Sequence, residues 1–425
     1  MTIDDSDRVR AWLEPRADEM ASLLGTLVAH ETENPPGRGL RECARALTDA
    51  LAGLGLDGEL IGVPAMDAQE DPCIVRATVG DGAKTLYFHG HFDVVPVQDR
   101  AQFTARRQDG KIIGRGTADM KGGIVSMLYG AAAARELGLL GDGKIVVHLV
   151  CDEETGSVAG SGFLRRHSMI DPAAVAMVTA EPSAGKIWHA ARGAVSLRVT
   201  VHGREAHVGQ ANFGINSFQH MVRIAAPLEK YVRTMLDRHT AFAMDGDDGH
   251  GSMVVVGGLS GGGSNFNVVP GTTWFTIDSR FNPEEDLEVE LKNLTTIIET
   301  AADGIGAEVT VELTQFQPSA STEPRHPAGQ ALAQCISRVT GAEPAFEMCA
   351  GILDTRWYAQ LDIPAFAYGP GRLDVSHGPN EYVDEQEMRS VAAVYALSAL
   401  ELLRSRRSAD SRSDLDSAEK PIAEA

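Results

Sequence analysis

The sequence has few cysteines, a deficit of basic residues and no long apolar run. Its five cysteines are widely and irregularly spaced, unlike a disulfide framework or a C-x-x-C zinc site, so we expect buried, reduced thiols. The 38 basic residues stand against 59 acidic ones, which disfavours nucleic acid or an anionic membrane as a partner. An apolar run of about 18 residues, enough to span a bilayer, is missing. The N-terminus M-T-I-D-D-S is acidic where a signal peptide would be basic, so the sequence predicts a cytoplasmic protein.

The length of the chain and the order of its segments predict two compact domains. The 425 residues are too many for one ordinary core. Short β-type runs at 73–79, 85–90 and 144–151 alternate with helical patterns at 40–54 and 120–137. Such alternation is typical of an α/β domain with a mixed, largely parallel sheet and helices on both faces.

A different rhythm begins near residue 193. Up to residue 313 the patterns follow the order β-α-β-β-α-β, with a single long helix expected at 214–238. This order is typical of a small ferredoxin-like α+β domain. Helix and strand patterns of the first kind then resume, so the small domain is predicted to be inserted into the large one. The predicted division is 1–192 for the first part of the large domain, 193–313 for the small domain, 314–405 for the second part and 406–425 for a disordered tail.

His91 and Asp93 lie two residues apart in H-F-D-V-V-P, directly after a predicted strand. On an extended chain their side chains point the same way. His91 could therefore bind a metal through one ring nitrogen while Asp93 accepts a hydrogen bond from the other. A solvated pair in a loop is the alternative interpretation.

Asp119 lies in the glycine-rich segment G-R-G-T-A-D-M-K-G-G, just before a predicted helix. Glycines allow the backbone to approach a ligand closely, and a carboxylate placed there can bridge two cations. Asp119 would be equally suited to capping the helix that follows.

The segment C-D-E-E-T-G-S follows an apolar strand and contains Glu153 and Glu154. Three consecutive carboxylates at the end of a buried strand repel one another unless a cation or a proton neutralises them. A surface acidic turn is the alternative. Glu181, in M-V-T-A-E-P-S, and His377, in a loop rich in glycine and proline, also follow apolar runs.

These residues end strands of one α/β sheet, where side chains can converge on a crevice. They supply two imidazoles and several carboxylates without thiolates. This donor set suits zinc, manganese or cobalt, so we expect one or two divalent cations, with zinc favoured.

Five motifs, in order, resemble those of one known family. They are H-x-D-V-V-P, G-R-G-x-x-D-M-K-G-G, D-E-E-x-G-S, E-P-S and H-G-P-N-E-Y. The family is that of aminoacylase, carboxypeptidase G, acetylornithine deacetylase and succinyl-diaminopimelate desuccinylase, which are co-catalytic metallohydrolases. Ordered motifs over about residues 15–403 make chance agreement negligible. The resemblance implies a metal-dependent hydrolase that cleaves an amide bond of an N-acyl amino acid or a related small molecule.

The resemblance also implies a ligand set. Asp119 would bridge two metals. His91 and Glu181 would complete one site, and Glu154 and His377 the other.

The resemblance makes Glu153 the general base that takes a proton from the attacking water and delivers it to the leaving amine, while Asp93 orients His91. A divalent cation lowers the pKa of water from about 15.7 towards 7, so a nearby carboxylate can finish the deprotonation. Glu153 and Glu154 would point in opposite directions if strand geometry persisted, so one could ligate while the other faces the substrate.

The inserted domain matches the family's lid, which commonly mediates dimerisation, so the resemblance implies a homodimer. His207 would reach the partner's active site and steady the oxyanion. Asn267, Arg280 and Gly351 would bind the substrate, with Arg280 holding a carboxylate. Without the resemblance, an exposed loop histidine, a turn asparagine and a surface arginine would be the preferred interpretations.

Two segments depart from the family's pattern. The loop at 98–111 lacks the usual Trp and P-F pair, and Ile352 and Leu353 replace small or hydroxyl residues. Both segments line the family's substrate pocket, so the resemblance does not identify the acyl group of the substrate. Removal of an amine from a non-peptide, aromatic carbon is the alternative reaction. A metal-binding relative without catalysis is a further alternative, and the intact Glu153 argues against it.

Overall fold

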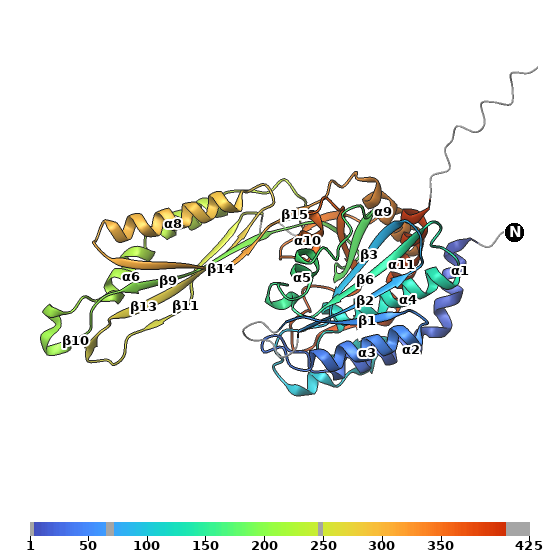
Figure 1. Cartoon of the computed structure of the whole chain (residues 1–425), viewed down its shortest axis with the longest axis horizontal. Helices are drawn as coiled ribbons and strands as arrows, with labels where there is room; N and C mark the ends of the chain where they lie inside the picture. The colour runs from blue at the N-terminus through green and yellow to red at the C-terminus, as the bar shows by residue number, and fades with distance from the viewer. Residues whose placement is uncertain (1–3, 65–71, 245–249, 405–425) are drawn as a thin grey trace, which may run out of the picture.

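The computed structural model describes residues 4–64, 72–244 and 250–404. They form two lobes, a large lobe that carries both ends of the described chain and an elongated small lobe (Figure 1). The predicted tail at 406–425 lies outside the described residues. Among the helices of the described ranges, none combines the length and apolarity that crossing a bilayer requires.

A nine-stranded mixed sheet forms the centre of the large lobe. Its inner strands run parallel in the order β6 (Gly143–Val150), β3 (Lys84–His91), β7 (Ala176–Pro182) and β17 (Ala365–Gly369). Strands β1 (Gly58–Gly62) and β2 (Cys73–Val79) extend one edge, and β8 (Ile187–Ala191), β15 (Ala320–Ser321) and β16 (Phe346–Cys349) extend the other. The inner strands are apolar and almost wholly buried, because helices cover both faces. The predicted α/β architecture is confirmed.

Two helical layers enclose this sheet. One contains α1 (Asp5–Leu13), α2 (Ala17–Ala29), α3 (Leu40–Gly53), α4 (Gly122–Glu136), α9 (Pro327–Thr340) and α11 (Glu385–Leu403), and the other contains α5 (Ser161–Arg166) and α10 (Thr355–Ala359). Leu86 and Phe88 of β3 pack into the first layer's core, whereas Tyr87 packs into the second, as the two-residue period of a strand requires.

Short elements complete the large lobe around the ends of the inner strands. The turns are η1 (Glu14–Arg16), η2 (Arg100–Phe103), η3 (Thr117–Lys121) and η4 (Glu153–Thr155). A small sheet contains β4 (Arg106–Gln108), β5 (Lys111–Ile113) and β18 (Tyr382–Asp384).

The small lobe, residues 193–317, is a four-stranded antiparallel sheet with helices on one face. The strand order is β11 (Met253–Gly262), β13 (Thr272–Phe281), β9 (Gly193–His202) and β14 (Glu308–Gln317). The helices are α6 (Ser217–Ala225), α7 (Leu228–Leu236) and α8 (Leu287–Asp303). Alternate residues of β9 are buried under these helices, which leaves the other face open. The chain thus follows the expected β-α-β-β-α-β order.

Two details of the small lobe differ from the sequence-based expectations. The single helix expected at 214–238 is divided into α6 and α7, because Pro227 has no N–H to continue the hydrogen-bond ladder of α6. The expected boundary after residue 313 falls inside β14, which continues to Gln317. This strand therefore runs from the small lobe directly to the large one.

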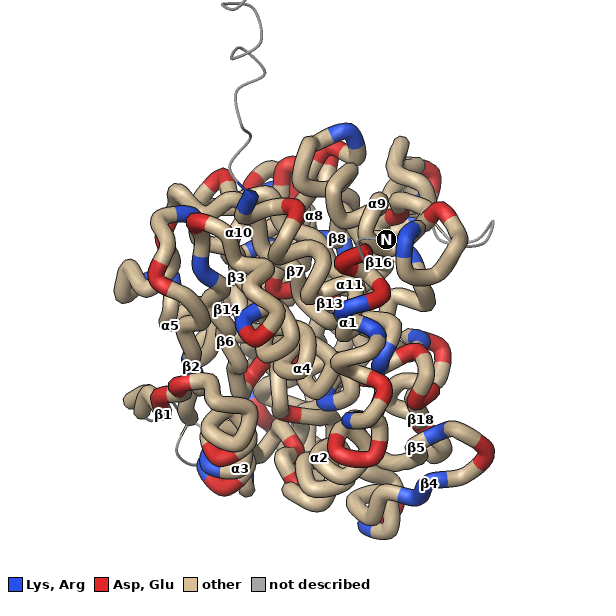
Figure 2. Tube along the Cα trace, turned by 90° about the vertical axis from the view of Figure 1, so that its right-hand side faces the viewer, with Lys and Arg blue, Asp and Glu red and all other residues tan. Residues whose placement is uncertain are grey.

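The positions of the cysteines and of the charged residues agree with what the composition predicts. The five cysteines are buried and form no disulfide. Figure 2, which looks onto the end of the large lobe, shows the described Lys and Arg positions scattered among Asp and Glu without a continuous basic band. The absence of a nucleic-acid partner stays a prediction.

Candidate metal centre

The predicted ligands meet at one edge of the large sheet. His91 ends β3, Glu181 lies in β7, and Glu154 lies in η4, which follows β6. Asp119 lies in η3 before α4, and His377 lies in the loop after β17. Because β6, β3, β7 and β17 are parallel neighbours, their carboxyl ends bring these side chains together, as expected for an α/β crevice.

Asp119 occupies the centre of this cluster. Its Oδ1 lies 3.1 Å from Nε2 of His91, and its Oδ2 lies 3.3 Å from Nε2 of His377. Glu181 Oε1 lies 4.0 Å from His91 Nε2, and Glu154 Oε1 lies 3.2 Å from His377 Nε2. The cluster therefore consists of two groups of three, whose ligand atoms lie within 4.8 Å of one another in each group and which share Asp119. Such an arrangement suits a bridging carboxylate.

One oxygen in the cluster tests whether the residues fit a cation. Oε1 of Glu181 is buried, and no hydrogen-bond partner for it exists among the described residues. Burial raises the pKa of Glu181 to about 8, and the negative charge of Asp119 adds to the rise, so a positive charge next to this carboxylate would favour its ionised form. A divalent cation would supply both the missing contact and this positive charge. The nitrogen and oxygen donors therefore fit zinc, manganese or cobalt.

The pKa values of the two histidines in the cluster are raised, because carboxylates surround both rings. Hydrogen bonds with Asp119 and Glu154 raise the pKa of His377 to about 10. Burial lowers the pKa of His91, but hydrogen bonds with Asp119 and Asp93 outweigh it and hold that pKa well above its usual value. Burial raises the pKa of Asp119, yet hydrogen bonds with both histidines bring it below its usual range. A cation would replace these imidazolium protons, so metal binding should release protons.

Glu153 stands apart from the ligand groups. Strand geometry does not persist to Glu153 and Glu154, because β6 ends at Val150 and both residues lie in the turn η4. The two side chains nevertheless separate, since only Glu154 belongs to a ligand group. Burial raises the pKa of Glu153 well above its usual value, and the negative charges of Asp354 and Glu181 add to the rise.

Asp93 is fully buried and links His91 to the D-E-E turn. Its Oδ1 lies 3.3 Å from Nδ1 of His91, which leaves Nε2 directed at Asp119. The carboxylate also accepts hydrogen bonds of 3.2 Å from the backbone N–H groups of Glu153 and Glu154. Asp93 therefore contacts the histidine on the side away from Asp119 and joins it to the turn that carries the acidic pair.

Asn34 supports the site from the proline- and glycine-rich segment between α2 and α3. Its Nδ2 lies 3.1 Å from Oδ2 of Asp93, 3.2 Å from the carbonyl oxygen of Cys151 and 2.9 Å from Oγ1 of Thr155. The surrounding E-N-P-P pattern is typical of any turn, so the sequence gives no signal of this role.

Replacing Asn34 with alanine should weaken metal binding about 10- to 100-fold, because second-layer partners of ligands have effects of this size. The loss of buried hydrogen bonds should also lower the free energy of unfolding by about 1–3 kcal/mol. Metal titration and urea denaturation measure the two effects. Asn293→Ala removes a hydrogen bond to Glu290 in the small lobe and serves as the control. An unchanged metal affinity in Asn34→Ala would show that Asn34 is not part of the centre.

Glu381 holds the Asp119 turn. Its Oε1 accepts hydrogen bonds from the backbone N–H groups of Ala118 and Asp119 at 3.0 and 3.1 Å, and its Oε2 lies 2.7 Å from Arg115. Glu381 lies in the H-G-P-N-E-Y motif, which begins with His377. The same motif therefore supplies a candidate ligand and a support for the bridging carboxylate.

A cavity of about 850 Å³ opens in front of the metal centre. Its walls include Asp119, Glu153, Glu154, Glu181, His377, Arg280, Gly351, Ile352 and Leu353. The expected substrate-binding residues Arg280 and Gly351 thus face the cavity with the ligands. Ile352 and Leu353 are among its walls, and the loop at 98–111 is not. Instead, Gln98 donates a hydrogen bond of 3.1 Å to the carbonyl oxygen of His377.

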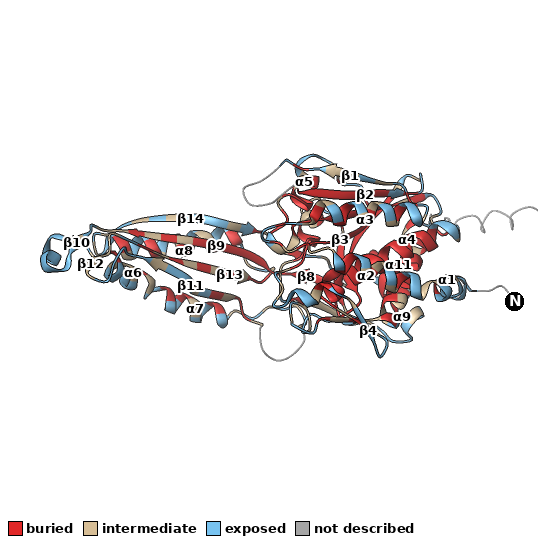
Figure 3. Cartoon of the chain, turned by 90° about the horizontal axis from the view of Figure 1, so that it is seen from below, coloured by how far each residue is buried: buried red, intermediate tan, exposed pale blue. Residues whose placement is uncertain are grey.

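The chain does not bring His207 and Asn267 to its own metal centre. His207 ends β10 (Ala206–His207), and Asn267 directly precedes β12 (Val268–Val269), with which β10 pairs. Figures 1 and 3 place β10 at the tip of the small lobe, the end farthest from the large lobe. His207 is exposed there.

Comparisons with known proteins agree with this architecture. Residues 87–401 match the profile of Peptidase family M20/M25/M40. A succinyl-diaminopimelate desuccinylase of Phenylobacterium zucineum is 30% identical over 332 residues, which cover 75% of this chain and 84% of the relative. An N-formyl-4-amino-5-aminomethyl-2-methylpyrimidine deformylase of Halalkalibacterium halodurans is 22% identical, covering 90% of this chain and 94% of the relative. The structure of the Saccharomyces cerevisiae di-peptidase Dug1p is similar with a TM-score of 0.76 at 16% identity, covering 94% and 99% of the two chains.

Proposed function

Because the chain belongs to Peptidase family M20/M25/M40 and is an amidohydrolase, we propose that it hydrolyses an N-acyl amino acid or a closely related amide. The observation that carries this proposal is one cavity that contains the ligand cluster, the carboxyl group of Glu153 and the guanidinium of Arg280. The ligand cluster and the carboxyl group of Glu153 suit amide hydrolysis, and the guanidinium of Arg280 suits the binding of a substrate carboxylate.

The cluster of His91, Asp119, Glu154, Glu181 and His377 would hold one or two divalent cations, with zinc favoured and manganese or cobalt as alternatives. When bound, such cations polarise a carbonyl and make water more acidic. Asp119 would serve both positions, because its two oxygens face different histidines.

Glu153 is proposed as the general base and acid. It faces the cavity beside the cluster without belonging to either ligand group. Its raised pKa makes the carboxyl group a better proton acceptor than an ordinary glutamate, and the same group can then return the proton to the leaving amine.

Arg280 is proposed to hold the carboxylate of the amino acid part. It lies at the end of β13, where this strand of the small lobe meets the cavity. Its guanidinium lies 2.8 Å from Asp278, and its side chain is 28% exposed, so planar donor groups remain accessible to a ligand.

We also propose that the small lobe forms a homodimer. It has two edge strands, β11 and β14, and its exposed apolar side chains include Phe213, Phe218, Val222, Val255, Leu259 and Phe266. Phe218 and Val222 are one turn apart on α6 and share a face. Pairing of two small lobes across a two-fold axis would cover an edge strand and bury exposed apolar side chains at the same time.

A dimer would explain the position of His207. An exposed histidine at the tip of the small lobe can reach a metal centre only in another subunit. We propose that His207 donates to the oxyanion in the partner's cavity, with Asn267 beside it as a substrate contact.

Replacing His207 with alanine should lower kcat about 10²- to 10³-fold, because it removes an oxyanion donor, while metal content stays normal. Mixing His207→Ala with Glu153→Ala subunits should restore activity, since each mixed dimer has one site in which both residues are intact. A preparation that contains only Glu153→Ala subunits and is treated in the same way provides the control. Confirmed heterodimers without recovered activity, or a fully active monomer, would contradict the arrangement.

The reaction itself is tested with a panel of substrates. The metal-loaded protein is incubated with N-acyl amino acids, dipeptides and aromatic amines, and mass spectrometry follows the products. Release of free amino acid from an N-acyl compound supports the proposal. Release of ammonia from an aromatic amine would instead support the alternative that the bulky Ile352 and Leu353 in the cavity wall leave open.

A further inference from the structure

A side chamber adjoins the catalytic cavity. It has a volume of about 350 Å³, within the range of cavities that hold small ligands. It shares Trp188, Cys349 and Leu373 with the walls of the catalytic cavity, so the two spaces meet at these side chains. A group attached to a substrate in the main cavity would therefore lie next to the chamber.

The chamber is mainly apolar. The indole of Trp188, on β8, lines one side, and Met348 and Cys349 come from the neighbouring strand β16. Met244 and Leu373 close other sides from loops. Leu373 is 44% exposed, so this large apolar side chain lies uncovered where the two spaces meet. A flat aromatic wall with adaptable methionine side chains suits an aromatic or branched apolar ligand.

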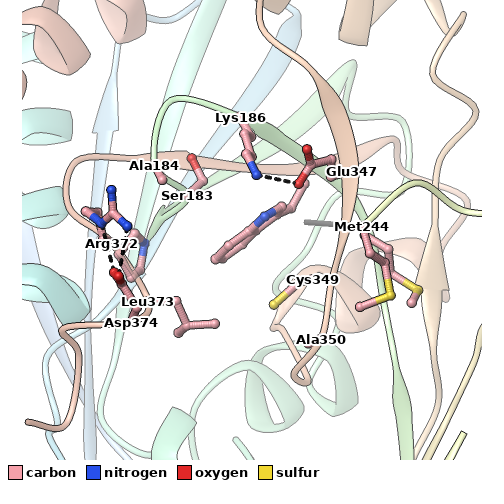
Figure 4. Close-up of a pocket in the computed structure, with 13 residues that line it drawn as sticks. Ser183, Ala184, Lys186, Met244, Glu347, Cys349, Ala350, Arg372, Leu373 and Asp374 are labelled. Atoms are coloured by element: carbon pink, nitrogen blue, oxygen red, sulfur yellow. Dashed lines mark hydrogen bonds and ion pairs between the residues drawn. The ribbon is translucent and has the colours of Figure 1, made fainter. Parts of the chain in front are cut away.

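The charged residues of the chamber are already paired. Nζ of Lys186 lies 2.8 Å from Glu347, and the guanidinium of Arg372 makes two hydrogen bonds of 2.8 Å to Asp374 (Figure 4). A ligand carboxylate could bind to either cation only in competition with these carboxylates. The chamber therefore favours an uncharged group, whereas Arg280 in the main cavity contacts Asp278 through one nitrogen, Nη1, and keeps its other donors for a ligand.

We propose that this chamber binds the acyl group of the substrate and selects an apolar one, either aromatic or branched aliphatic. This inference rests on the proposed function. Arg280 would hold the carboxylate of the amino acid in the main cavity, which leaves the chamber for the group on the other side of the scissile bond. Hydrolysis breaks the C–N bond, joins the oxygen of water to the acyl carbon and releases a carboxylic acid and a free amine.

The expected selectivity follows from burial. One extra methylene in an apolar pocket changes kcat/KM by about 10- to 200-fold. An N-benzoyl or N-isovaleryl amino acid should therefore exceed the N-acetyl compound by at least about 10-fold in kcat/KM, and an N-succinyl compound should be the poorest because its acyl group carries a charge.

The test introduces a large side chain into the chamber from either of two separate segments of the chain. Ala350→Trp and Met244→Trp place an indole in its volume, and Ala342→Trp places one on an exposed residue before β16 as the control. The ratio of kcat/KM for N-benzoyl to N-acetyl substrate should fall at least about 10-fold in both filling variants and stay constant in the control. Circular dichroism and metal content verify that each variant is folded and loaded.

The outcomes separate the two claims. A wild-type preference for the N-acetyl or N-succinyl compound, or an unchanged ratio in both filled and correctly folded variants, would overturn the role of the chamber and leave amide hydrolysis standing. Failure of the loaded wild-type protein to release an amino acid from any N-acyl compound would overturn both.

Discussion

Replacing Glu153 with glutamine is expected to lower kcat by about 10²- to 10⁴-fold, the range for losing a positioned acid or base. The amide keeps the shape of the side chain but cannot accept the proton of the attacking water. Glu153 lies outside both ligand groups, so the metal content of Glu153→Gln should equal that of the wild type. Steady-state kinetics and elemental analysis of the same preparation measure both quantities.

A matched control separates this effect from a loss of surface charge. Glu59→Gln makes the same chemical change on the edge strand β1, where Glu59 pairs with Arg76. It should retain wild-type kcat. Retention of more than half the activity in Glu153→Gln would remove Glu153 from the proposed role.

Replacing Asp119 with alanine should remove both cations. Its two oxygens face His91 and His377, which belong to different ligand groups, and no other residue belongs to both groups among the described residues. Loss of this carboxylate therefore removes one ligand from each position at once. Elemental analysis after dialysis should find both positions depleted, and activity should fall to background.

Single-site variants make this experiment discriminating. His377→Ala and Glu181→Ala each alter only one ligand group, so each should leave the other position more fully occupied than Asp119→Ala does. Asp109→Ala removes a carboxylate from an exposed turn and should leave the metal content unchanged. Full metal occupancy and normal activity in Asp119→Ala would show that Asp119 is not a metal ligand and serves only at the start of the helix that follows.

The sequence predicts the metal centre well because the ligands depend on local order. Apolar runs mark the inner strands, and the carboxyl ends of parallel neighbours must meet, so residues just beyond those runs converge. His91, Glu154 and Glu181 all follow this rule. The β-α-β-β-α-β order of the small lobe could likewise be predicted from the sequence, since the hydrophobic periods of strands and helices differ clearly.

Features that depend on distant contacts could not be predicted in this way. Asn34 and Glu381 support the centre through hydrogen bonds to Asp93 and to the Asp119 turn, which are far from them in sequence. The side chamber joins β8, β16 and two loops, so no single segment indicates it. The contact of the loop at 98–111 with the centre is of the same kind, because Gln98 donates a hydrogen bond to the backbone of the distant residue His377.

The most direct test of the account is hydrolysis of an N-acyl amino acid by one preparation before and after metal removal. We expect the loaded protein to release equal amounts of free amino acid and carboxylic acid, the chelated protein to release neither, and addition of zinc or manganese to restore the reaction. Unchanged amide hydrolysis after complete removal of metal, verified by elemental analysis, would contradict the assignment of the cluster around Asp119 as the catalytic centre.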